Sequence, residues 1–96
     1  MQQSYVYILK CNDNSYYTGV TSNLEQRIFQ HESGFYPECY TFKRRPLELV
    51  FYAEFTDINF AIEKEKQIKK WSRLKKEALI NGDYDSLPNL ARKSFS

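Results

Sequence analysis

The stretch that decides the fold is residues 4–21, which read SYVYILKCNDNSYYTGVT. Its first part, Ser4 to Lys10, is aromatic and β-branched and is apolar on both faces, which predicts a strand that is covered on both sides inside a sheet. Residues 12–15 are a turn signal, because short polar side chains bond to nearby backbone groups and tolerate left-handed conformations. Residues 16–21 then predict the returning strand of an antiparallel hairpin.

A first helix is expected directly after the hairpin. Residues 22–25 have the spacing of a capping box, in which Ser22 accepts from a helical amide while Glu25 reaches back to the cap. The helix is therefore expected to start near Asn23. Gly34 is the expected stop, because glycine readily adopts the left-handed conformation that ends helices. The inward side chains are expected to be Leu24, Ile28 and Phe29.

One strand and two more helices are expected in the second half of the chain. Residues 46–54 predict a third strand, with a proline at the first position, where a missing amide is tolerated. Asp57 is a suitable cap for a second helix that runs to about Trp71. Residues 72–80 predict a third helix that ends at Asn81-Gly82.

The order strand, strand, helix, strand, helix, helix predicts a small α/β domain of the α+β type. Its core element would be a three-stranded antiparallel sheet flanked by helices. With 96 residues, the chain is long enough for one domain and a modest core. We assign residues 1–82 to this domain. Residues 83–96 are turn-like and are expected to form a loosely ordered C-terminal tail.

Composition argues against several other classes of protein. No apolar run approaches the roughly 20 residues needed to span a bilayer, so no membrane association is expected. The N-terminus lacks a basic segment followed by an apolar one, which a secretory signal would need. Cys11 and Cys39 are the only cysteines, which favours a cytoplasmic protein with reduced thiols. Two cysteines and one histidine also make a poor structural zinc site.

Positive charge is concentrated locally, although the formal net charge is only +2. Seven lysines and arginines lie between Lys64 and Lys76, and a second cluster occupies residues 43–45. Such clusters suit a nucleic-acid backbone, and the alternative is a solvated helix face. The residues expected to bind nucleic acid are Lys43, Arg44, Arg45, Lys69, Lys70 and Arg73.

Glu65 is the residue that helical spacing alone singles out. The second predicted helix carries isoleucine or alanine at positions 58, 61, 62 and 68, and Glu65 falls on the same stripe. A carboxylate on that stripe faces the sheet, and burying it without a partner is costly. Two interpretations stay open, a metal ligand or a structural ion pair with Arg27.

Arg27 and His31 lie four residues apart on the first predicted helix and therefore share a face. Arginine offers a planar fork for phosphate oxygens, and histidine can move protons near neutral pH. The alternative for His31 is ordinary packing beside the core. Tyr7 and Tyr17 fall on the two hairpin strands, where tyrosine is common. Gly19 lies on the same face as Tyr17 and opens space there for another group.

The hairpin and the first helix resemble a known family. Tyr5-Val6-Tyr7 followed by Tyr17-Thr18-Gly19 is similar to the paired signature of the GIY-YIG nucleases, although Tyr5, Val6 and Thr18 differ from it. The resemblance spans about residues 4 to 80. It is strongest to small, stand-alone bacterial endonucleases that are similar to the N-terminal nuclease domain of an excision-repair subunit. The positions that match the functional residues of the family are Tyr7, Tyr17, Arg27, His31 and Glu65.

The resemblance implies metal-assisted hydrolysis of phosphodiester bonds. Glu65 would hold one Mg²⁺ or Mn²⁺, and Arg27 would bind the scissile phosphate. Tyr17 would position or deprotonate the attacking water, and Tyr7 would orient water or phosphate. A free tyrosine has a pKa of about 10, so His31 is expected to assist or to act as the base itself.

The expected substrate is DNA, whether duplex, nicked or branched, and the expected setting is DNA repair. A domain this small has no obvious module for reading sequence. We therefore expect structure-selective or weakly sequence-selective cutting, or a protein partner that supplies specificity. Two alternatives stay open: a catalytically weak nucleic-acid-binding module of the same fold, and a protein-interaction domain whose tyrosines belong to its core. The second alternative predicts no affinity for Mg²⁺ and no salt-dependent DNA binding.

Overall fold

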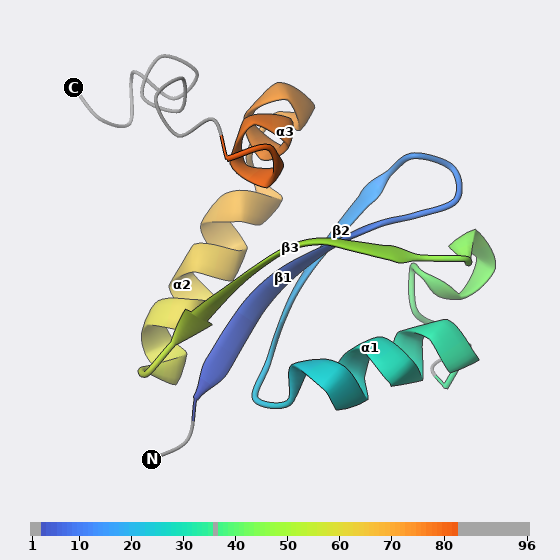
Figure 1. Ribbon diagram of the computed structural model, residues 1–96, viewed down its shortest axis with the longest axis horizontal. Helices are drawn as coiled ribbons and strands as arrows, with labels where there is room; N and C mark the ends of the chain where they lie inside the picture. Colours follow the sequence, from blue (N-terminus) through green and yellow to red (C-terminus); the bar gives the residue numbers. More distant parts are fainter. Residues whose placement is uncertain (1–2, 36, 83–96) are drawn as a thin grey trace.

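The computed structural model describes residues 3–35 and 37–82, which form one antiparallel sheet and three α-helices (Figure 1). The elements are β1 Ser4–Lys10, β2 Tyr16–Thr21, α1 Leu24–Ser33, the 3₁₀ turn Phe42–Arg44, β3 Glu48–Phe55, α2 Ile58–Lys69 and α3 Arg73–Ile80. The predicted α+β class and the order β-β-α-β-α-α are confirmed. The tail predicted for residues 83–96 lies outside the described residues.

The strand β1 lies in the middle of the sheet, whose order is β2-β1-β3. Both neighbours run antiparallel to β1, which confirms the hairpin and the internal position predicted from its two apolar faces. Asn14 allows the tight hairpin turn by adopting a left-handed conformation with φ of 69°. In this register Tyr7 lies opposite Gly19 of β2 on one side and opposite Tyr52 of β3 on the other.

The two faces of the sheet carry different neighbours, because successive side chains of a strand point to opposite sides. One face of β1 packs against α2 and α3 in a core that consists of Val6, Ile8, Ala61, Ile68 and Leu79. The other face carries Tyr7, which contacts His31 of α1. The sheet therefore separates an aliphatic core from a polar, aromatic layer under α1.

The helix α1 begins and packs slightly differently from the prediction. Its N-cap is Asn23, whose side chain accepts from the Gln26 amide, rather than Ser22. The reason is that Thr21 Oγ1 accepts from the Asn23 amide and fixes the entry turn one residue later. Gly34 ends the helix at φ 74°, as expected. Phe29 is 71% exposed, so its inward assignment was wrong. It lies one helical step, about 100°, beyond Ile28 and so leaves the buried face.

The second half of the chain follows the prediction with small shifts. Asp57 and Ser72 cap α2 and α3 by accepting from backbone amides of the first turns. The third strand begins at Glu48 instead of residue 46. The helix α2 buries Ala61, Glu65 and Ile68, as the stripe predicted. Ile58, however, is 44% exposed, because the first turn of α2 has not yet reached the buried core that begins at Ala61.

The two cysteines are free thiols, with Cys11 buried and Cys39 half-buried. Within the described residues, no helix combines the length and the apolar character that a membrane crossing requires.

Candidate active site

Tyr7 is the central side chain of the polar layer and is fully buried. Its phenol lies across β2 at Gly19, where an added Cβ atom would overlap Tyr7 Oη and come within 2.5 Å of Tyr7 Cζ. Only Gly34 and Gly82 among the described glycines have positive φ, so Gly19 is needed for space and not for backbone conformation. Tyr7 is therefore the group that fills the space predicted beside Gly19.

His31 connects Tyr7 to the segment that follows α1. Its Nε2 lies 3.0 Å from Tyr7 Oη, and its Nδ1 lies 2.9 Å from Thr41 Oγ1. Only 3% of His31 is exposed. Burial lowers the pKa of His31 below its ordinary value, and the charge of Arg27 lowers it further. The imidazole is therefore neutral at pH 7 and able to accept a proton.

Arg27 lies beside the Tyr7 hydroxyl, one helical turn before His31. Burial raises the pKa of Tyr7 to about 12, while the charge of Arg27 and its hydrogen bond to the phenol act in the opposite direction. Burial also raises the pKa of Tyr17. The Tyr17 ring meets the His31 ring edge-on, with centroids 5.2 Å apart. Both phenols are thus protonated at neutral pH, around a neutral imidazole and a permanent cation.

Glu65 comes from α2 and is largely buried, with 10% of its side chain exposed. Its Oε2 lies 2.7 Å from Lys69 Nζ, one turn further along the helix. The sequence had suggested Arg27 as the ion-pair partner, whereas the carboxylate pairs with Lys69. The charge of Glu65 also raises the pKa of Tyr7, although this is a minor effect beside burial. Its carboxylate therefore lies within electrostatic reach of the phenol.

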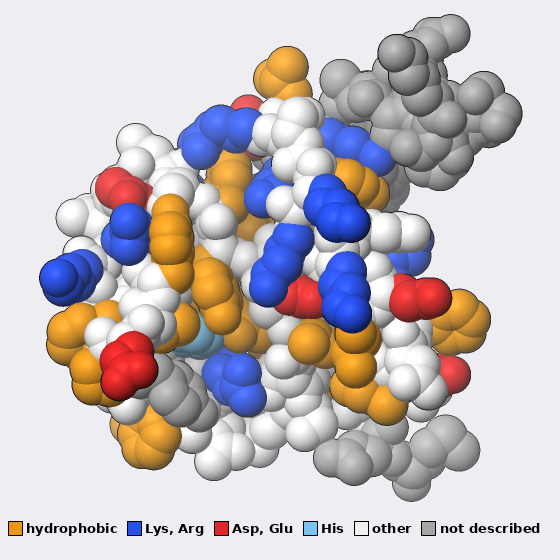
Figure 2. Space-filling model, turned by 180° about the vertical axis from the view of Figure 1, so that it is seen from behind, with side chains coloured by type: hydrophobic (Ala, Val, Ile, Leu, Met, Phe, Trp, Pro, Cys, Tyr) orange, Lys and Arg blue, Asp and Glu red, His pale blue; other side chains and the backbone are white. Residues whose placement is uncertain are grey.

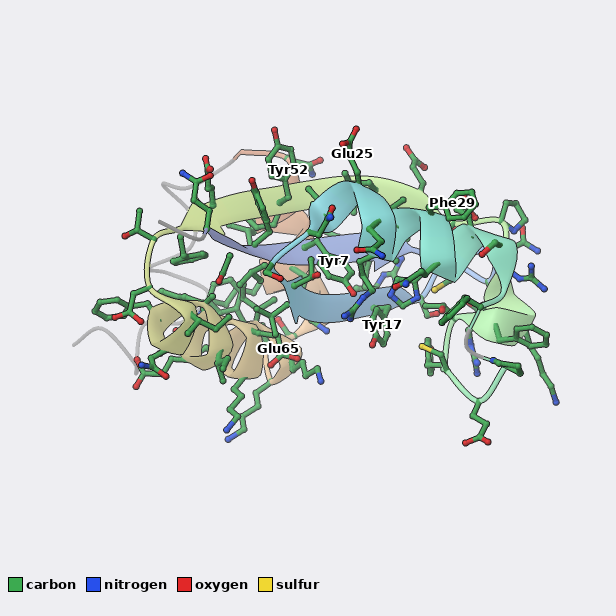
Figure 3. All side chains as sticks on the ribbon, turned by 90° about the horizontal axis from the view of Figure 1, so that it is seen from below. Tyr7, Tyr17, Glu25, Phe29, Tyr52 and Glu65 are labelled. Atoms are coloured by element: carbon green, nitrogen blue, oxygen red, sulfur yellow. The ribbon has the colours of Figure 1, made fainter. Side chains whose placement is uncertain are left out.

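The five predicted side chains come from β1, β2, α1 and α2 and lie near one another. Figure 3 shows the labelled Tyr7, Tyr17 and Glu65 side chains close together beside β2, between α1 and α2. Arg27 and His31 join them through Tyr7. The structure thus brings the five residues together, and their individual roles stay predictions.

Sequence reasoning missed the segment between α1 and the 3₁₀ turn as part of this site. Thr41 is 1% exposed and contacts His31, and Cys39 Sγ lies 4.0 Å from His31 Nδ1. Tyr40 stacks on the Tyr17 ring at 6.3 Å. Helical or strand periodicity does not mark residues in a loop. The one available signal was that a buried histidine needs a partner for its second nitrogen.

The basic residues predicted to bind nucleic acid differ in their surroundings. Arg44 pairs with Asp13 and lies over the Tyr40 ring, and Arg73 pairs with Glu77. Lys43 and Lys70 are exposed, and Lys69 is exposed apart from its contact with Glu65. In Figure 2 lysines and arginines gather over α2 and α3 on the same face as the histidine. A binding role for these residues stays a prediction.

A pocket of about 290 Å³ adjoins the site; it is lined by Tyr16, Tyr17, Thr18, Tyr40, Lys69 and Lys76. The Thr18 hydroxyl is buried and, among the described residues, has no hydrogen-bond partner. The pocket therefore has aromatic walls and two lysine ammonium groups next to Tyr17. A larger hollow of about 630 Å³ between β3, α2 and α3 is lined by none of the five residues.

Comparison with known proteins bears on this arrangement of tyrosines, arginine, histidine and glutamate. A family model described as the GIY-YIG catalytic domain matches residues 3–78. The chain belongs to this family. The GIY-YIG resemblance read from Tyr7 and Tyr17 is confirmed, and it places the chain in a superfamily of nucleases. The match ends within α3, four residues before the predicted domain boundary at residue 82.

Relatives of this GIY-YIG protein are small chains of similar length. A UPF0213 protein from Syntrophus aciditrophicus is 45% identical over 80 residues, which cover 83% of this chain and 92% of the relative. UPF0213 protein SH2523 from Staphylococcus haemolyticus is also 45% identical, covering 83% of this chain and 96% of the relative. These names state no activity.

Two solved structures share the fold. The solution NMR structure of UPF0213 protein BH0048 from Bacillus halodurans is 42% identical, with a TM-score of 0.55, and the match covers 82% of this chain and 83% of that one. The solution NMR structure of protein EF2693 from E. faecalis is 30% identical, with a TM-score of 0.61 and a coverage of 88% for both chains. The fold of this GIY-YIG chain is thus found in experimental structures of its relatives.

Proposed function

We propose that this protein is a metal-dependent endonuclease that hydrolyses DNA phosphodiester bonds with structural or weak sequence selectivity. The observation that carries the proposal is the gathering of Tyr7, Tyr17, Arg27, His31 and Glu65 beside β2 in a GIY-YIG domain. A phosphate-binding cation, a proton acceptor and a carboxylate within reach of one phenol are the parts that phosphodiester hydrolysis needs.

Glu65 fits a single divalent cation of the Mg²⁺ or Mn²⁺ kind. The described residues contain no group of three or more acidic, histidine or cysteine side chains that would form an all-protein metal cage. Mg²⁺ is commonly held by one or two carboxylates and keeps several waters, so one buried carboxylate is a sufficient donor set. When bound there, the ion would stabilise negative charge on the phosphate and the leaving oxygen.

The other side chains divide the remaining work. Arg27 would bind the scissile phosphate through its planar guanidinium. The neutral imidazole of His31 would accept the Tyr7 proton, because Nε2 lies 3.0 Å from Tyr7 Oη. This contact favours Tyr7, and not Tyr17 as expected from the sequence, as the group that would then take a proton from the attacking water. Tyr17, whose pKa is also raised by burial, would orient that water.

The positions of the basic residues suggest how DNA would be bound. Lysines of α2 and α3 lie on the face that carries the site, where they would contact backbone phosphates without reading bases (Figure 2). The proposal includes a DNA-repair setting and a protein partner that would supply specificity. In the second candidate function, a catalytically weak nucleic-acid-binding module, the same surface would bind nucleic acid with little or no cleavage.

The function is tested by incubating the protein with branched, nicked and duplex DNA and with RNA of the same sequence. Reactions contain Mg²⁺, Mn²⁺ or a chelator. We expect cutting of DNA that requires the metal. Salt-sensitive binding without cutting of any substrate would favour the binding module. The absence of both cutting and binding would support the protein-interaction alternative instead.

The pH dependence should report His31. Because burial lowers its pKa below 6.5, the folded state holds this proton less tightly than the unfolded chain. The stabilisation is therefore complete above about pH 6.5 and is lost as the pH falls toward the folded pKa. Cleavage should decline over the same acidic range, as the base becomes protonated.

The sequence contains one histidine, so an NMR titration of imidazole resonances gives the pKa of His31 directly. Unfolding by urea at several pH values gives the stability profile. The acid loss of stability should be smaller in His31→Gln. A folded-state pKa above the ordinary value of 6.5 would contradict the prediction.

Lys69 should compete with the metal for Glu65. Its Nζ lies 2.7 Å from Glu65 Oε2, yet 54% of the lysine side chain is exposed, so the pair is weak. Lys69→Gln should tighten Mn²⁺ binding about two- to fivefold, because the free energy of an exposed ion pair corresponds to a change in affinity of about that size. Calorimetric titration with Mn²⁺ measures this.

The matched control for Lys69 is Lys70→Gln, which removes an equal charge from the exposed neighbouring position. It should change the Mn²⁺ affinity less than Lys69→Gln does. Equal effects of the two variants would mean that the metal responds only to overall charge, and Glu65 would lose its assignment as the ligand.

A further inference from the structure

Four buried or half-buried groups form one continuous series of contacts through the polar layer. Tyr7 Oη lies 3.0 Å from His31 Nε2, and His31 Nδ1 lies 2.9 Å from Thr41 Oγ1. Thr41 Oγ1 in turn donates to Cys39 Sγ at 3.4 Å. The series thus runs from β1 through α1 into the loop before the 3₁₀ turn. Which group donates and which accepts at each contact decides whether His31 Nε2 can accept a proton.

The Tyr7 end of the series fixes the first proton. The Arg27 guanidinium beside the phenol carries only N–H donors, so it can interact with the Tyr7 oxygen only as an acceptor. The proton of Tyr7 then needs an acceptor of its own, because the phenol is fully buried. His31 Nε2 is the acceptor that lies at 3.0 Å. This end of the series therefore favours an unprotonated Nε2, and the partner of Nδ1 decides whether that tautomer is held.

With Nε2 unprotonated, the neutral imidazole carries its proton on Nδ1. That nitrogen faces Thr41 Oγ1 at 2.9 Å, with Cys39 Sγ further away at 4.0 Å. Thr41 accepts from Nδ1 and donates its own hydroxyl proton to Cys39. Each donor in the series finds one acceptor. If every proton ran the opposite way, Tyr7 would accept from both Arg27 and His31, and its own proton would have no acceptor in the series.

We propose that Thr41 is a positioning residue that holds His31 in the Nδ1-protonated tautomer, so that Nε2 faces Tyr7 as a proton acceptor. Thr41 does so because its single hydroxyl proton is committed to Cys39 and leaves the oxygen as an acceptor for Nδ1. The tautomer itself is a property of the fold. Its effect on cleavage rests on the proposed nuclease function.

The tautomer is measured directly by NMR. A long-range ¹H–¹⁵N spectrum distinguishes a protonated from an unprotonated imidazole nitrogen, and the single histidine makes the signals unambiguous. We expect Nδ1 to be protonated in the parent protein at about pH 8, well above the pKa of an ordinary histidine, and in Thr41→Ser, which keeps the hydroxyl. In Thr41→Val, which has nearly the same shape, we expect a mixture of tautomers. A parent protein with protonated Nε2 would overturn the proposal.

Cleavage provides the second readout. Thr41→Val should lower kcat about 10- to 100-fold with little change in KM, because the base loses orientation and not substrate contact. Thr41→Ser should restore most of the rate. An active parent whose rate and tautomer are both unchanged by Thr41→Val would refute the role of Thr41.

The nuclease function and the tautomer of His31 can fail separately. If the parent protein cuts no nucleic acid, the nuclease proposal fails, while the NMR result still decides the tautomer. If Thr41→Val does not fold, Cys39→Ala tests the same series of contacts, because it removes the acceptor of the Thr41 proton from a half-buried position. We expect the Nδ1-protonated share to fall in Cys39→Ala. An unchanged tautomer in Cys39→Ala would refute the proposal, because it would mean that the hydrogen bond from Thr41 to Cys39 does not determine which nitrogen of His31 is protonated.

Discussion

Glu65→Gln is expected to reduce metal-dependent cleavage by about a thousandfold or more, because the substitution removes the one carboxylate assigned to the metal. The shape of the side chain is preserved. The lost ion pair with Lys69 is exposed on the lysine side and should cost less than about 1 kcal/mol of folding free energy. Single-turnover cleavage rates and urea unfolding measure the two effects separately.

The matched control for this substitution is Glu63→Gln, two residues earlier on α2, where the side chain is exposed. It removes the same charge from the same helix and should leave the rate nearly unchanged. DNA binding, measured by fluorescence anisotropy without metal, should be similar in both variants. Cutting that survives Glu65→Gln would remove Glu65 from the site.

Gly19→Ala, on β2, is expected to disturb the site by displacing the Tyr7 ring. The added Cβ would overlap Tyr7 Oη and come within 2.5 Å of its Cζ, so the buried phenol must move. Overpacking of this kind costs about 1 to 3 kcal/mol. Displacing the ring also breaks the contact with His31 Nε2, and cleavage should fall about a hundredfold or more. Urea unfolding and single-turnover rates test both parts.

A double-mutant cycle separates the loss of the Tyr7 contact from general damage. In Tyr7→Phe the hydroxyl that contacts His31 is already missing, so adding Gly19→Ala should reduce cleavage much less than it does in the parent. The cost in stability should remain, because the ring still occupies the space over Gly19. Fully additive losses in the rate would argue that Gly19 acts independently of the Tyr7 hydroxyl.

The parts of the fold that sequence predicted well are those controlled by local patterns. Two apolar faces placed β1 in the middle of the sheet, and helical spacing predicted the burial of Glu65 on α2. Gly34 ended α1 because a left-handed conformation was needed there. Each of these depends on the few residues around it, so one sequence is enough to reveal it.

The parts that sequence could not predict depend on contacts between side chains in three dimensions. Asn23 replaced Ser22 as the cap because of a hydrogen bond to Thr21, and Phe29 proved to be exposed. Thr41 reaches His31 from a loop ten residues away, where no periodic pattern exists to mark it. The choice of Lys69 rather than Arg27 beside Glu65 likewise depends on the direction in which each side chain points.

The pairing of Tyr7 with Gly19 also links assembly of the candidate site to the accuracy of folding. A hairpin whose strands pair one residue out of register would turn every side chain of the shifted strand to the wrong face of the sheet. Tyr7 would then meet a side chain where it needs an empty position. Such a misaligned species would keep its β-sheet signal in circular dichroism and yet lack a competent centre. Recovery of the contact between Tyr7 and His31, and not recovery of secondary structure, is therefore the appropriate measure of successful refolding for this chain.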